Sequence, residues 1–312
     1  MDGGPVDLPT LPYAEWRQTK DTLHLWAQIA GKVKLVSTPP DNHWWNVPFY
    51  VDVRGLTTRR MRQNGIAFSV DFDFIDHRLV VRTDRGQVES FALADGLSVA
   101  AFDSQFHDLL ARCGVDIAIR EQPFGVPMTT PFPEDGEHAS YQAEYVERFW
   151  RILGWVESVF TEYSGWFCGK SSPVHLFWHS FDLALTRFSG RRAPVLAGTD
   201  PVTQEAYSHE LISFGFWAGD DNVTEAAFYS YTAPEPDGLR EQPLYPTPAR
   251  WVEQATGSLA VLPYDAVRVS SDPRAALLGF LESAYQAGAG GWDRDGLTSS
   301  FCPTPLELRQ AY

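Results

Sequence analysis

The sequence has few of the features that mark a secreted, membrane-bound or zinc-binding protein. Its three cysteines, Cys113, Cys168 and Cys302, are an odd set without a C-x-x-C pair, which argues against a disulfide framework and a cysteine zinc site. No run approaches the 18 apolar residues of a membrane-spanning helix, and the N-terminus lacks a basic and apolar leader. We therefore expect a cytoplasmic protein that does not bind membranes.

Positive charge is also scarce. The chain carries 25 Lys and Arg against 40 Asp and Glu, a net charge of -15. Proteins that bind nucleic acid or anionic lipid need clustered positive charge, so neither partner is expected. A 44% hydrophobic and 14% aromatic composition over 312 residues is instead typical of a folded chain with one large or two smaller cores.

Common catalytic and nucleotide-binding motifs are missing. Residues 165–171 resemble a phosphate-binding loop, but three residues separate the glycines where four are needed, and two of these are the bulky Trp166 and Phe167. The sequence contains no G-x-G-x-x-G, G-x-S-x-G or H-E-x-x-H motif. These absences leave no cofactor to predict.

Hydrophobic periodicity gives the expected organisation of the first half. Apolar residues recur at threes and fours over residues 13–35 and 98–113, which predicts two amphipathic helices. Strict alternation over 45–53 and 68–74 predicts strands of an antiparallel sheet between them. We expect a first half over 1–120, ended by a connector at 121–140 that is rich in Pro and Gly.

The second half is expected to repeat this order over residues 141–290, with insertions, before a tail at 291–312. A periodic helix over 145–163 precedes a long strand over 174–187, and the pair Asp272-Pro273 should start a late helix. Trp16 and Trp150 are 134 residues apart, and Trp45 and Trp178 are 133 apart. The predicted fold is therefore α+β, with two pseudo-repeated halves that each place an antiparallel sheet under helices.

Polar chemistry is densest between residues 173 and 192. We predict catalytic roles for His175 and Asp182 here, and for His209 and Glu210 in a second-half insertion, because these side chains can move protons. The predicted substrate-binding residues are Arg187, Arg191, Trp178, His43 and Trp44. No metal ligand is predicted. Each group also has a structural alternative, as a rim histidine, a capping carboxylate or a buried anchor.

The spacing of His175 and Asp182 separates their expected roles. Seven residues apart on one regular strand, they point to opposite faces. We therefore expect His175 to line a cleft and Asp182 to pair with an arginine. In the first half, Asp71 and Asp73 should lie on a solvated face of their strand.

Several short motifs are spread along nearly the whole chain: Leu11-Pro12-Tyr13 with Glu15-Trp16, Asn42-His43-Trp44-Trp45, Phe72-Asp73-Phe74-Ile75-Asp76-His77, Phe181-Asp182-Leu183-Ala184, Thr186-Arg187-Phe188-Ser189-Gly190 and Ser208-His209-Glu210. In this combination the sequence resembles an uncharacterised bacterial family, the domain of unknown function 5996. The resemblance implies a soluble protein without an assigned reaction, cofactor or catalytic residue. It also implies that a small residue often replaces His179, which favours His175 and Asp182 as site residues.

Two functions of different classes fit these observations. The first is a cytosolic enzyme on a small organic substrate, with acid/base or metal-assisted chemistry in a cleft between the halves. The second is a protein that binds a ligand or peptide without catalysis in an aromatic-lined cleft, since tryptophans and irregular loops also serve recognition. Convergence of the predicted polar side chains in one recess would favour the enzyme.

Overall fold

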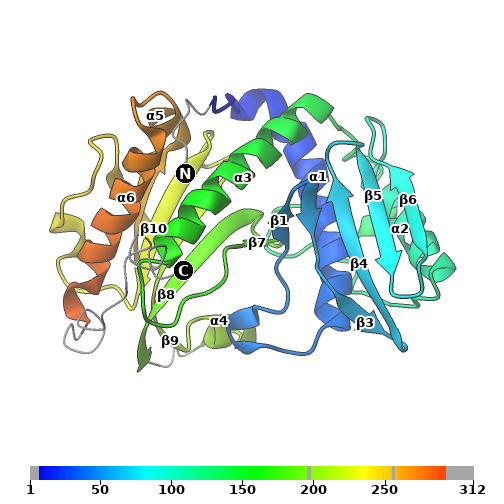
Figure 1. Ribbon diagram of the computed structural model, residues 1–312, viewed down its shortest axis with the longest axis horizontal. Helices are drawn as coiled ribbons and strands as arrows, with labels where there is room; N and C mark the ends of the chain where they lie inside the picture. Colours follow the sequence, from blue (N-terminus) through cyan, green and yellow to red (C-terminus); the bar gives the residue numbers. More distant parts are fainter. Residues whose placement is uncertain (1–6, 195–197, 255–256, 293–312) are drawn as a thin grey trace, which may run out of the picture. The chain divides into compact units, whose positions relative to one another are not determined.

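The computed structural model describes residues 7–194, 198–254 and 257–292, which form two compact units (Figure 1). The first unit comprises residues up to 154 together with 175–182 and 218–225, and the second comprises 155–174, 183–217 and the residues from 226. Each unit contains an antiparallel sheet and helices. The predicted α+β class is thus confirmed, whereas the connector at 121–140 stays a sequence-based prediction. Most of the predicted tail, from residue 293, lies outside the described residues.

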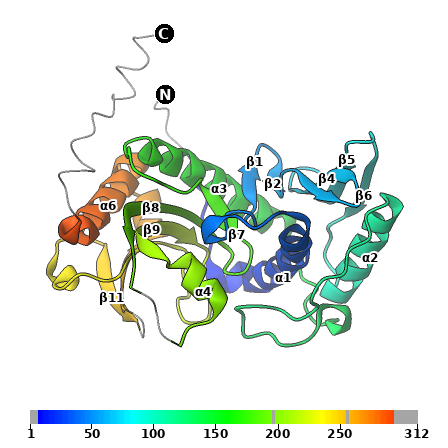
Figure 2. The ribbon, with the colours of Figure 1, turned by 90° about the horizontal axis from the view of Figure 1, so that it is seen from below.

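In the first unit, the long helix α1 precedes the strands of the sheet along the sequence, and helix α2 follows them. Figure 2 shows both helices beside the sheet, whose strands run in the order β1-β2-β4-β5-β6, with β3 paired to β4. The elements are α1 (Tyr13–Ser37), β1 (Tyr50–Asp52), β2 (Gly55–Thr57), β3 (Met61–Gln63), β4 (Ile66–Asp73), β5 (Arg78–Thr83), β6 (Val88–Ala92) and α2 (Val99–Arg112). Both predicted helices are confirmed.

An aromatic core joins the two helices to the sheet. Phe102 of α2 stacks on Trp26 of α1 at 5.1 Å and on Phe72 of β4 at 6.2 Å between ring centroids. All three side chains are buried, so the alternation along β4 and the helical periodicity of α1 and α2 place their apolar faces in one core. Burial of such large rings contributes strongly to the stability of a core.

The predicted strand over residues 45–53 is wrong for its first half. Only Tyr50–Asp52 forms β1, and residues 42–44 form the short 3-10 helix η1 (Asn42–Trp44). Pro48 explains the difference, because proline has no N–H to donate to a neighbouring strand. Val53, expected on the buried face, is 82% exposed.

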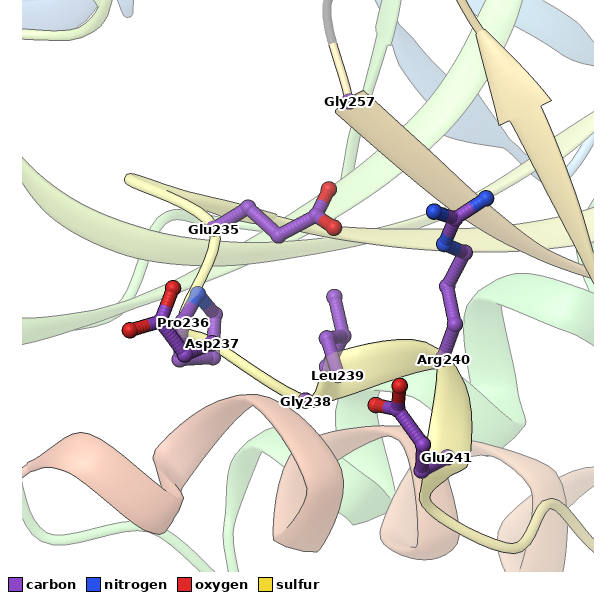
Figure 3. A pocket seen from close by; sticks show the side chains of 8 residues that line it. All are labelled: Glu235, Pro236, Asp237, Gly238, Leu239, Arg240, Glu241 and Gly257. Carbon is purple, nitrogen blue, oxygen red and sulfur yellow. The ribbon is translucent and has the colours of Figure 1, made fainter.

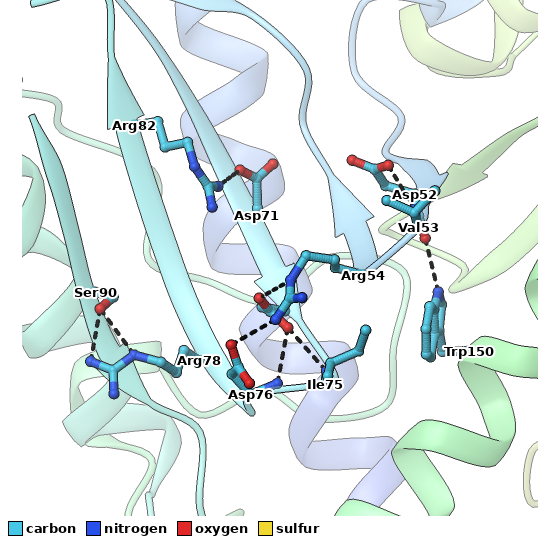
Figure 4. Close-up of polar contacts among 11 residues, drawn as sticks. Asp52, Val53, Arg54, Asp71, Ile75, Asp76, Arg78, Arg82, Ser90 and Trp150 are labelled. Atoms are coloured by element: carbon cyan, nitrogen blue, oxygen red, sulfur yellow. Dashed lines mark hydrogen bonds and ion pairs between the residues drawn. The ribbon is translucent and has the colours of Figure 1, made fainter. Parts of the chain in front are cut away.

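The polar face of the first sheet is paired and not simply solvated, as Figure 4 shows. Asp73 is buried and accepts hydrogen bonds from Arg54 Nε at 2.6 Å and from the backbone N–H groups of Ile75 and Asp76. Although burial raises the pKa of Asp73, these hydrogen bonds outweigh it and lower the pKa. The expectation of a solvated face is wrong for this carboxylate. Asp71 is half-buried beside Arg82.

The predicted long strand over residues 174–187 is also wrong, because the chain turns within it. Strand β7 (His175–Phe177) ends at a turn, and β8 (Asp182–Arg192) starts after it. The N–H of Phe181 donates to the carbonyl oxygen of Phe177 at 2.7 Å, and Phe181 adopts φ 58. A positive φ is uncommon for a bulky residue, and no pattern of hydrophobicity signals it. In the first unit, β7 reaches β1 through paired backbone bonds between Phe49 and Leu176.

The second unit contains the C-terminal part of helix α3 (Ala143–Ser164), which starts in the first unit. Its strands lie in the order β11-β12-β10-β9-β8, and α6 packs against β9 and β10 (Figure 1). The further elements are α4 (Pro201–Ala206), β9 (His209–Trp217), β10 (Ala227–Ala233), β11 (Arg250–Gln254), β12 (Gly257–Pro263), α5 (Tyr264–Arg268) and α6 (Pro273–Gly288), with 3-10 turns η2 (Phe132–Glu134, in the first unit), η3 (Leu239–Glu241) and η4 (Ala289–Gly291). Asp272 caps α6 as predicted, because its carboxylate accepts the N–H of Ala275 at 2.9 Å.

The predicted internal repeat is not confirmed. Both units combine a long helix, an antiparallel sheet and a later helix, but their strand orders differ. In the first unit β4, β5 and β6 follow one another in the sheet, whereas in the second β12 lies between β10 and β11. The duplication stays a prediction. No helix in the described part of the chain is long and apolar enough to cross a membrane.

Candidate functional site

The residues predicted to form one site belong to both units. The first unit holds His175, Asp182, Trp178, His43 and Trp44, and the second holds Arg187, Arg191, His209 and Glu210.

In the second unit, Arg191 and Glu210 are bound to each other. Arg191 Nε donates to Glu210 Oε2 at 2.9 Å, and the hydroxyl of Ser189 donates to the same oxygen at 2.7 Å. His209 starts β9, and its Nδ1 lies 3.1 Å from the hydroxyl of Ser208. The ion pair between Arg191 and Glu210 neutralises the charge that either side chain could otherwise offer to a ligand.

Arg187 lies in the aromatic core of the second unit and is 2% exposed. Its guanidinium carbon lies 3.7 Å from the ring centroid of Tyr163, 4.8 Å from Tyr285 and 5.0 Å from Phe167. A guanidinium nitrogen donates to the carbonyl oxygen of Tyr163 at 2.6 Å. We call this arrangement the Arg187 cage. Cation–π contacts and a backbone carbonyl hold the arginine as part of the core.

A surface hollow of about 310 Å³ in the second unit is lined by acidic groups (Figure 3). The carboxylate of Glu235 accepts hydrogen bonds from the hydroxyl and backbone N–H of Ser258, and Arg240 pairs with Glu253 at 3.0 Å. These groups are used in local structure. In the part of the chain that the structure describes, no group of three or more His, Cys, Asp and Glu could hold a metal ion.

In the first unit, Trp178 and His43 are both buried. The indole of Trp178 packs directly on Gly31 of α1, where the Cβ of any other residue would overlap the ring. The ring of His43 lies 5.5 Å from that of Trp45, and both His43 and Trp44 have positive φ in η1. These contacts make Trp178 and His43 parts of the packed interior of the first unit.

Asp182 is buried at the start of β8 and accepts a hydrogen bond from the hydroxyl of Ser180. Burial lowers the pKa of His179, and the charge of Asp182 acts in the opposite direction. The arginine partner expected for Asp182 stays a prediction. Because the turn at 178–181 breaks the strand, His175 and Asp182 no longer have the separation of seven positions along one strand.

His175 is one of three predicted site residues, with Trp178 and Arg187, that bury a nitrogen without a hydrogen-bond partner among the described residues. It is 1% exposed, and its Nδ1 is buried without a hydrogen-bond partner among the described residues. Burial, reinforced by the charges of Lys34 and Arg59, lowers the pKa of His175 to about 3. The imidazole is therefore neutral at physiological pH and leaves one ring nitrogen unsatisfied, at a cost to folding.

Sequence reasoning missed Lys34, which lies near the end of α1. It is 3% exposed, its ammonium donates to the carbonyl oxygen of Pro48, and its Nζ lies 5.0 Å from the ring centroid of Tyr50. Burial, helped by the charge of Arg59, lowers the pKa of Lys34 to about 7. A sizeable fraction of this amine is therefore uncharged near neutral pH.

Tyr50 is the common neighbour of the basic groups. The guanidinium carbon of Arg59 lies 3.2 Å from the Tyr50 ring centroid, and the His175 ring centroid lies 6.2 Å from it. We call Lys34, Tyr50, Arg59 and His175 the Tyr50 cluster. Neither Lys34 nor Arg59 forms an ion pair within the described ranges. Burial raises the pKa of Tyr50 and the charge of Asp41 adds to this, but the Asp41 carboxylate forms no ion pair with either basic side chain among the described residues.

Arg59 is held in a strained backbone conformation at the exposed side of this cluster. Its φ is 57, a left-handed value that costs free energy for a residue with a Cβ. The Thr57 hydroxyl accepts the Arg59 N–H at 3.0 Å, and the Thr58 hydroxyl donates to the Arg59 carbonyl oxygen at 2.9 Å. Two side chains thus fix the arginine over the ring.

One signal in the sequence could have drawn attention to Lys34. The chain has only four lysines against 21 arginines. Three of them, Lys20, Lys32 and Lys34, lie on α1, and all three are buried. Lysine is rarely fully buried without a pair, so a chain that otherwise uses arginine and keeps its lysines on one amphipathic helix is unusual.

The fold and these contacts define an α+β protein with two antiparallel sheets and, in its first unit, a basic cluster of which Lys34 and His175 are buried. Residues 8–299 match a family described as a family of unknown function, DUF5996, and the chain belongs to this family. The resemblance found in the sequence motifs is thereby confirmed. Neither a curated protein nor a solved structure matches the chain.

Proposed function

We propose that this protein is an enzyme that binds a small organic anion at the Tyr50 cluster and acts on it by acid/base chemistry. The observation that carries the proposal is the unsatisfied Nδ1 of His175, buried among basic groups that have no carboxylate partner. Strained backbone and unpaired buried polar atoms are costly to a fold, and they concentrate where a ligand or reaction uses them.

Charge favours an anion as the ligand. The net charge of the chain is -15, yet Lys34 and Arg59 lie close to the same ring without a bound acid. A carboxylate placed between these two groups would gain charge-assisted hydrogen bonds from both. A negatively charged ligand would therefore neutralise the positive charge of the Tyr50 cluster.

The exposure of the cluster changes in steps from solvent to core. Arg59 is exposed, Tyr50 is half-buried, and Lys34 and His175 are buried. The exposed Arg59 side chain lies over the Tyr50 ring. Such an order suits a site that excludes water from its reacting groups, which strengthens electrostatic interactions inside.

The two buried bases suit different steps of proton transfer. Lys34, with a pKa of about 7, can exist as amine or ammonium near neutral pH and so can accept or donate a proton. His175 is neutral there, so its imidazole offers one donor and one acceptor. These properties support acid/base chemistry, and the metal-assisted alternative has no supporting ligand group in the described chain.

Other parts of the functional prediction stay proposals. Roles for Asp182, His209 and Glu210 in proton transfer, for Arg187, Arg191, Trp178, His43 and Trp44 in substrate binding, and a cytoplasmic location rest on the sequence. The proposal for the Tyr50 cluster does not depend on these roles or on this location. A cleft between the halves is not needed by it, because all four residues of the cluster belong to the first unit.

Pyruvate is a suitable probe, because it is a small carboxylate with exchangeable methyl protons. The full-length protein would be labelled with [13C,15N]lysine, and its four lysines followed by NMR as sodium pyruvate is added. We expect saturable shifts of the Lys34 signals. In D2O, the protein should also catalyse deuterium exchange into the pyruvate methyl group, since abstraction of that proton needs a base.

Two neighbouring arginines give a matched control. Arg59→Gln should raise the pyruvate concentration that half-saturates the shift about tenfold, because it removes a charge-assisted hydrogen bond. Arg60→Gln, at an exposed residue next to it, should leave this concentration unchanged. Saturable binding without deuterium exchange would support the non-catalytic ligand-binding function in place of the enzyme. An absence of any saturable shift at Lys34 with pyruvate, acetate and inorganic phosphate would refute both at this cluster.

A further inference from the structure

We propose that the substrate of this site is a short oxo acid, whose carbonyl carbon forms an imine with Lys34 Nζ while Arg59 binds its carboxylate. The inference rests on the proposed function and goes further by naming a covalent step and a substrate class.

The positions of the two cations fit a molecule with two adjacent functional groups. The distances to the shared Tyr50 centroid are 5.0 Å for Lys34 Nζ and 3.2 Å for the Arg59 guanidinium carbon. The two groups are therefore no more than about 8 Å apart. A short oxo acid carries the two groups that these side chains would bind, a ketone for Lys34 and a carboxylate for Arg59, and pyruvate is the smallest ketone of this kind.

The surroundings of Lys34 suit a nucleophile. An amine attacks a carbonyl only when it is unprotonated, and lysines become reactive through desolvation or a neighbouring cation. Lys34 has both, being 3% exposed and close to the charge of Arg59. Its one hydrogen bond, to the Pro48 carbonyl oxygen, uses an N–H and leaves the nitrogen lone pair available.

The step balances without any further reactant. The lone pair of Nζ forms a bond to the carbonyl carbon, the C=O π electrons move to oxygen, and that oxygen takes up the proton lost by nitrogen. The hydroxyl group then takes up one proton and leaves as water while the nitrogen lone pair forms C=N, and the nitrogen gives up its remaining proton, so that no net proton is consumed. One amine and one ketone thus give one imine and one water. The ring centroid of the neutral His175 imidazole lies 6.2 Å from that of Tyr50. Its Nδ1 has no hydrogen-bond partner among the described residues, and this atom can donate or accept one hydrogen bond to the addition intermediate, according to its tautomer.

Lys32 provides an internal comparison. It lies two positions away on α1, it is also buried, and its pKa is lowered by burial and by Arg120. Its ammonium lies 5.9 Å from the ring centroid of Phe132. It has no contact with the Tyr50 ring or with His175 among the described residues. If burial alone made a lysine react, Lys32 would be labelled as well.

The test is reductive trapping. The full-length protein is incubated with pyruvate and sodium cyanoborohydride, which reduces an imine to a stable secondary amine, and the modified peptide is located by mass spectrometry. We expect a single adduct on Lys34, with Lys20, Lys32 and Lys170 unmodified. Arg59→Gln should slow trapping about tenfold by loss of the carboxylate contact, and Arg60→Gln should leave the rate within about twofold.

Competition separates the two groups of the substrate. Acetate, a carboxylate without a ketone, should slow trapping, whereas sodium chloride at the same ionic strength should not. Acetone, a ketone without a carboxylate, should label Lys34 far more slowly than pyruvate. Lys34→Met should abolish the adduct while the thermal unfolding of the variant shows that it is folded.

The outcomes distinguish this inference from the proposed function. If pyruvate shifts the Lys34 signals and exchanges its methyl protons but no adduct is trapped, the proposed function stands and the imine is refuted. An adduct spread equally over the lysines or confined to the N-terminal amine also refutes the imine. If neither binding, exchange nor trapping occurs, both fail.

Discussion

The two units bury a cation in different ways. In the Arg187 cage of the second unit, the guanidinium is surrounded by the Tyr163 carbonyl oxygen and by three close rings, with a fourth ring, that of Phe214, at 5.9 Å. Glu282, which accepts a hydrogen bond from the Tyr163 hydroxyl, adds a compensating negative charge. In the Tyr50 cluster of the first unit, Lys34 and Arg59 share one ring and have no ion pair within the described ranges.

The difference separates a cation held by structural contacts from a lysine that we propose to be reactive. Arginine keeps its proton in a protein interior, so the Arg187 cage must supply stabilising contacts at all times. Lysine can lose its proton, and the depressed pKa of Lys34 reflects surroundings that do not stabilise its charge. A fold that keeps such a lysine beside an unsatisfied histidine gives up stability at that place.

The largest effect is expected from Arg187→Met. The substitution removes the bond to the Tyr163 carbonyl oxygen and the contacts with three rings, and we expect a loss of about 3 kcal/mol in the free energy of unfolding. Urea denaturation at pH 7 measures it. Arg187→Lys should recover only part of the loss, since an ammonium cannot stack as a planar guanidinium does. An unchanged free energy would remove the distinction between the two sites.

Lys34→Met should raise the free energy of unfolding, whereas Arg187→Met lowers it. The wild-type protein must bury an amine whose pKa falls from 10.5 to about 7, and an apolar side chain of similar length avoids this cost. After allowance for the lost bond to Pro48, we expect a gain of about 2 kcal/mol at pH 7. The wild type should become more stable from pH 7 to 9, because the unfolded chain keeps the proton that the folded chain loses. The variant should lack this rise, and a loss of stability would mean that Lys34 is structural.

The third prediction concerns acid. His175 has a folded pKa of about 3 against an ordinary value of 6.5, so below pH 6.5 the unfolded chain binds a proton that the folded chain rejects. Stability is therefore lost as the pH falls from 6.5 towards 3, by about 1.4 kcal/mol per pH unit from this residue. His175→Gln should reduce the slope by that amount. His24, whose pKa is also about 3, gives a matched control: His24→Gln should reduce the slope alike but leave pyruvate binding intact.

The smallest effect is expected from Arg59→Gln on the titration of Lys34. The positive charge of Arg59 lowers the pKa of the amine, after the larger contribution of burial. Its removal should raise the Lys34 midpoint by about half a pH unit, the size of a partly solvent-screened interaction. Arg60→Gln should leave the midpoint where it is. Equal shifts in the two variants would show a general charge effect instead of a contact within the Tyr50 cluster.

Much of the fold could be predicted from the sequence. The periodicity of α1 and α2, the alternation along β4 and the Asp272 cap of α6 each have a local physical cause, and local patterns reveal them. The two wrong strands failed for reasons outside hydrophobicity. Pro48 cannot donate to a ladder, and the turn after β7 depends on a positive φ at Phe181.

The candidate site was predicted only in part. His175 was identified because it lies in a segment dense in polar and aromatic residues, and it belongs to the Tyr50 cluster. Lys34 was not, because a lysine on an amphipathic helix usually extends its ammonium to solvent. Its burial depends on Pro48, Tyr50 and Arg59, which only the tertiary structure brings to the end of α1. The spacing of these residues along the sequence does not indicate that they are close in space.

The titration of Lys34 tests the central claim most directly. In protein labelled with [13C,15N]lysine, the Lys34 signals are assigned by their loss in Lys34→Met and followed by NMR from pH 5 to 11. A Lys34 midpoint near pH 7, as burial and the Arg59 charge require, would show that the fold holds an uncharged amine ready to react. A midpoint at or above 10.5, the ordinary value for lysine, would contradict it and leave Lys34 a structural cation like Arg187.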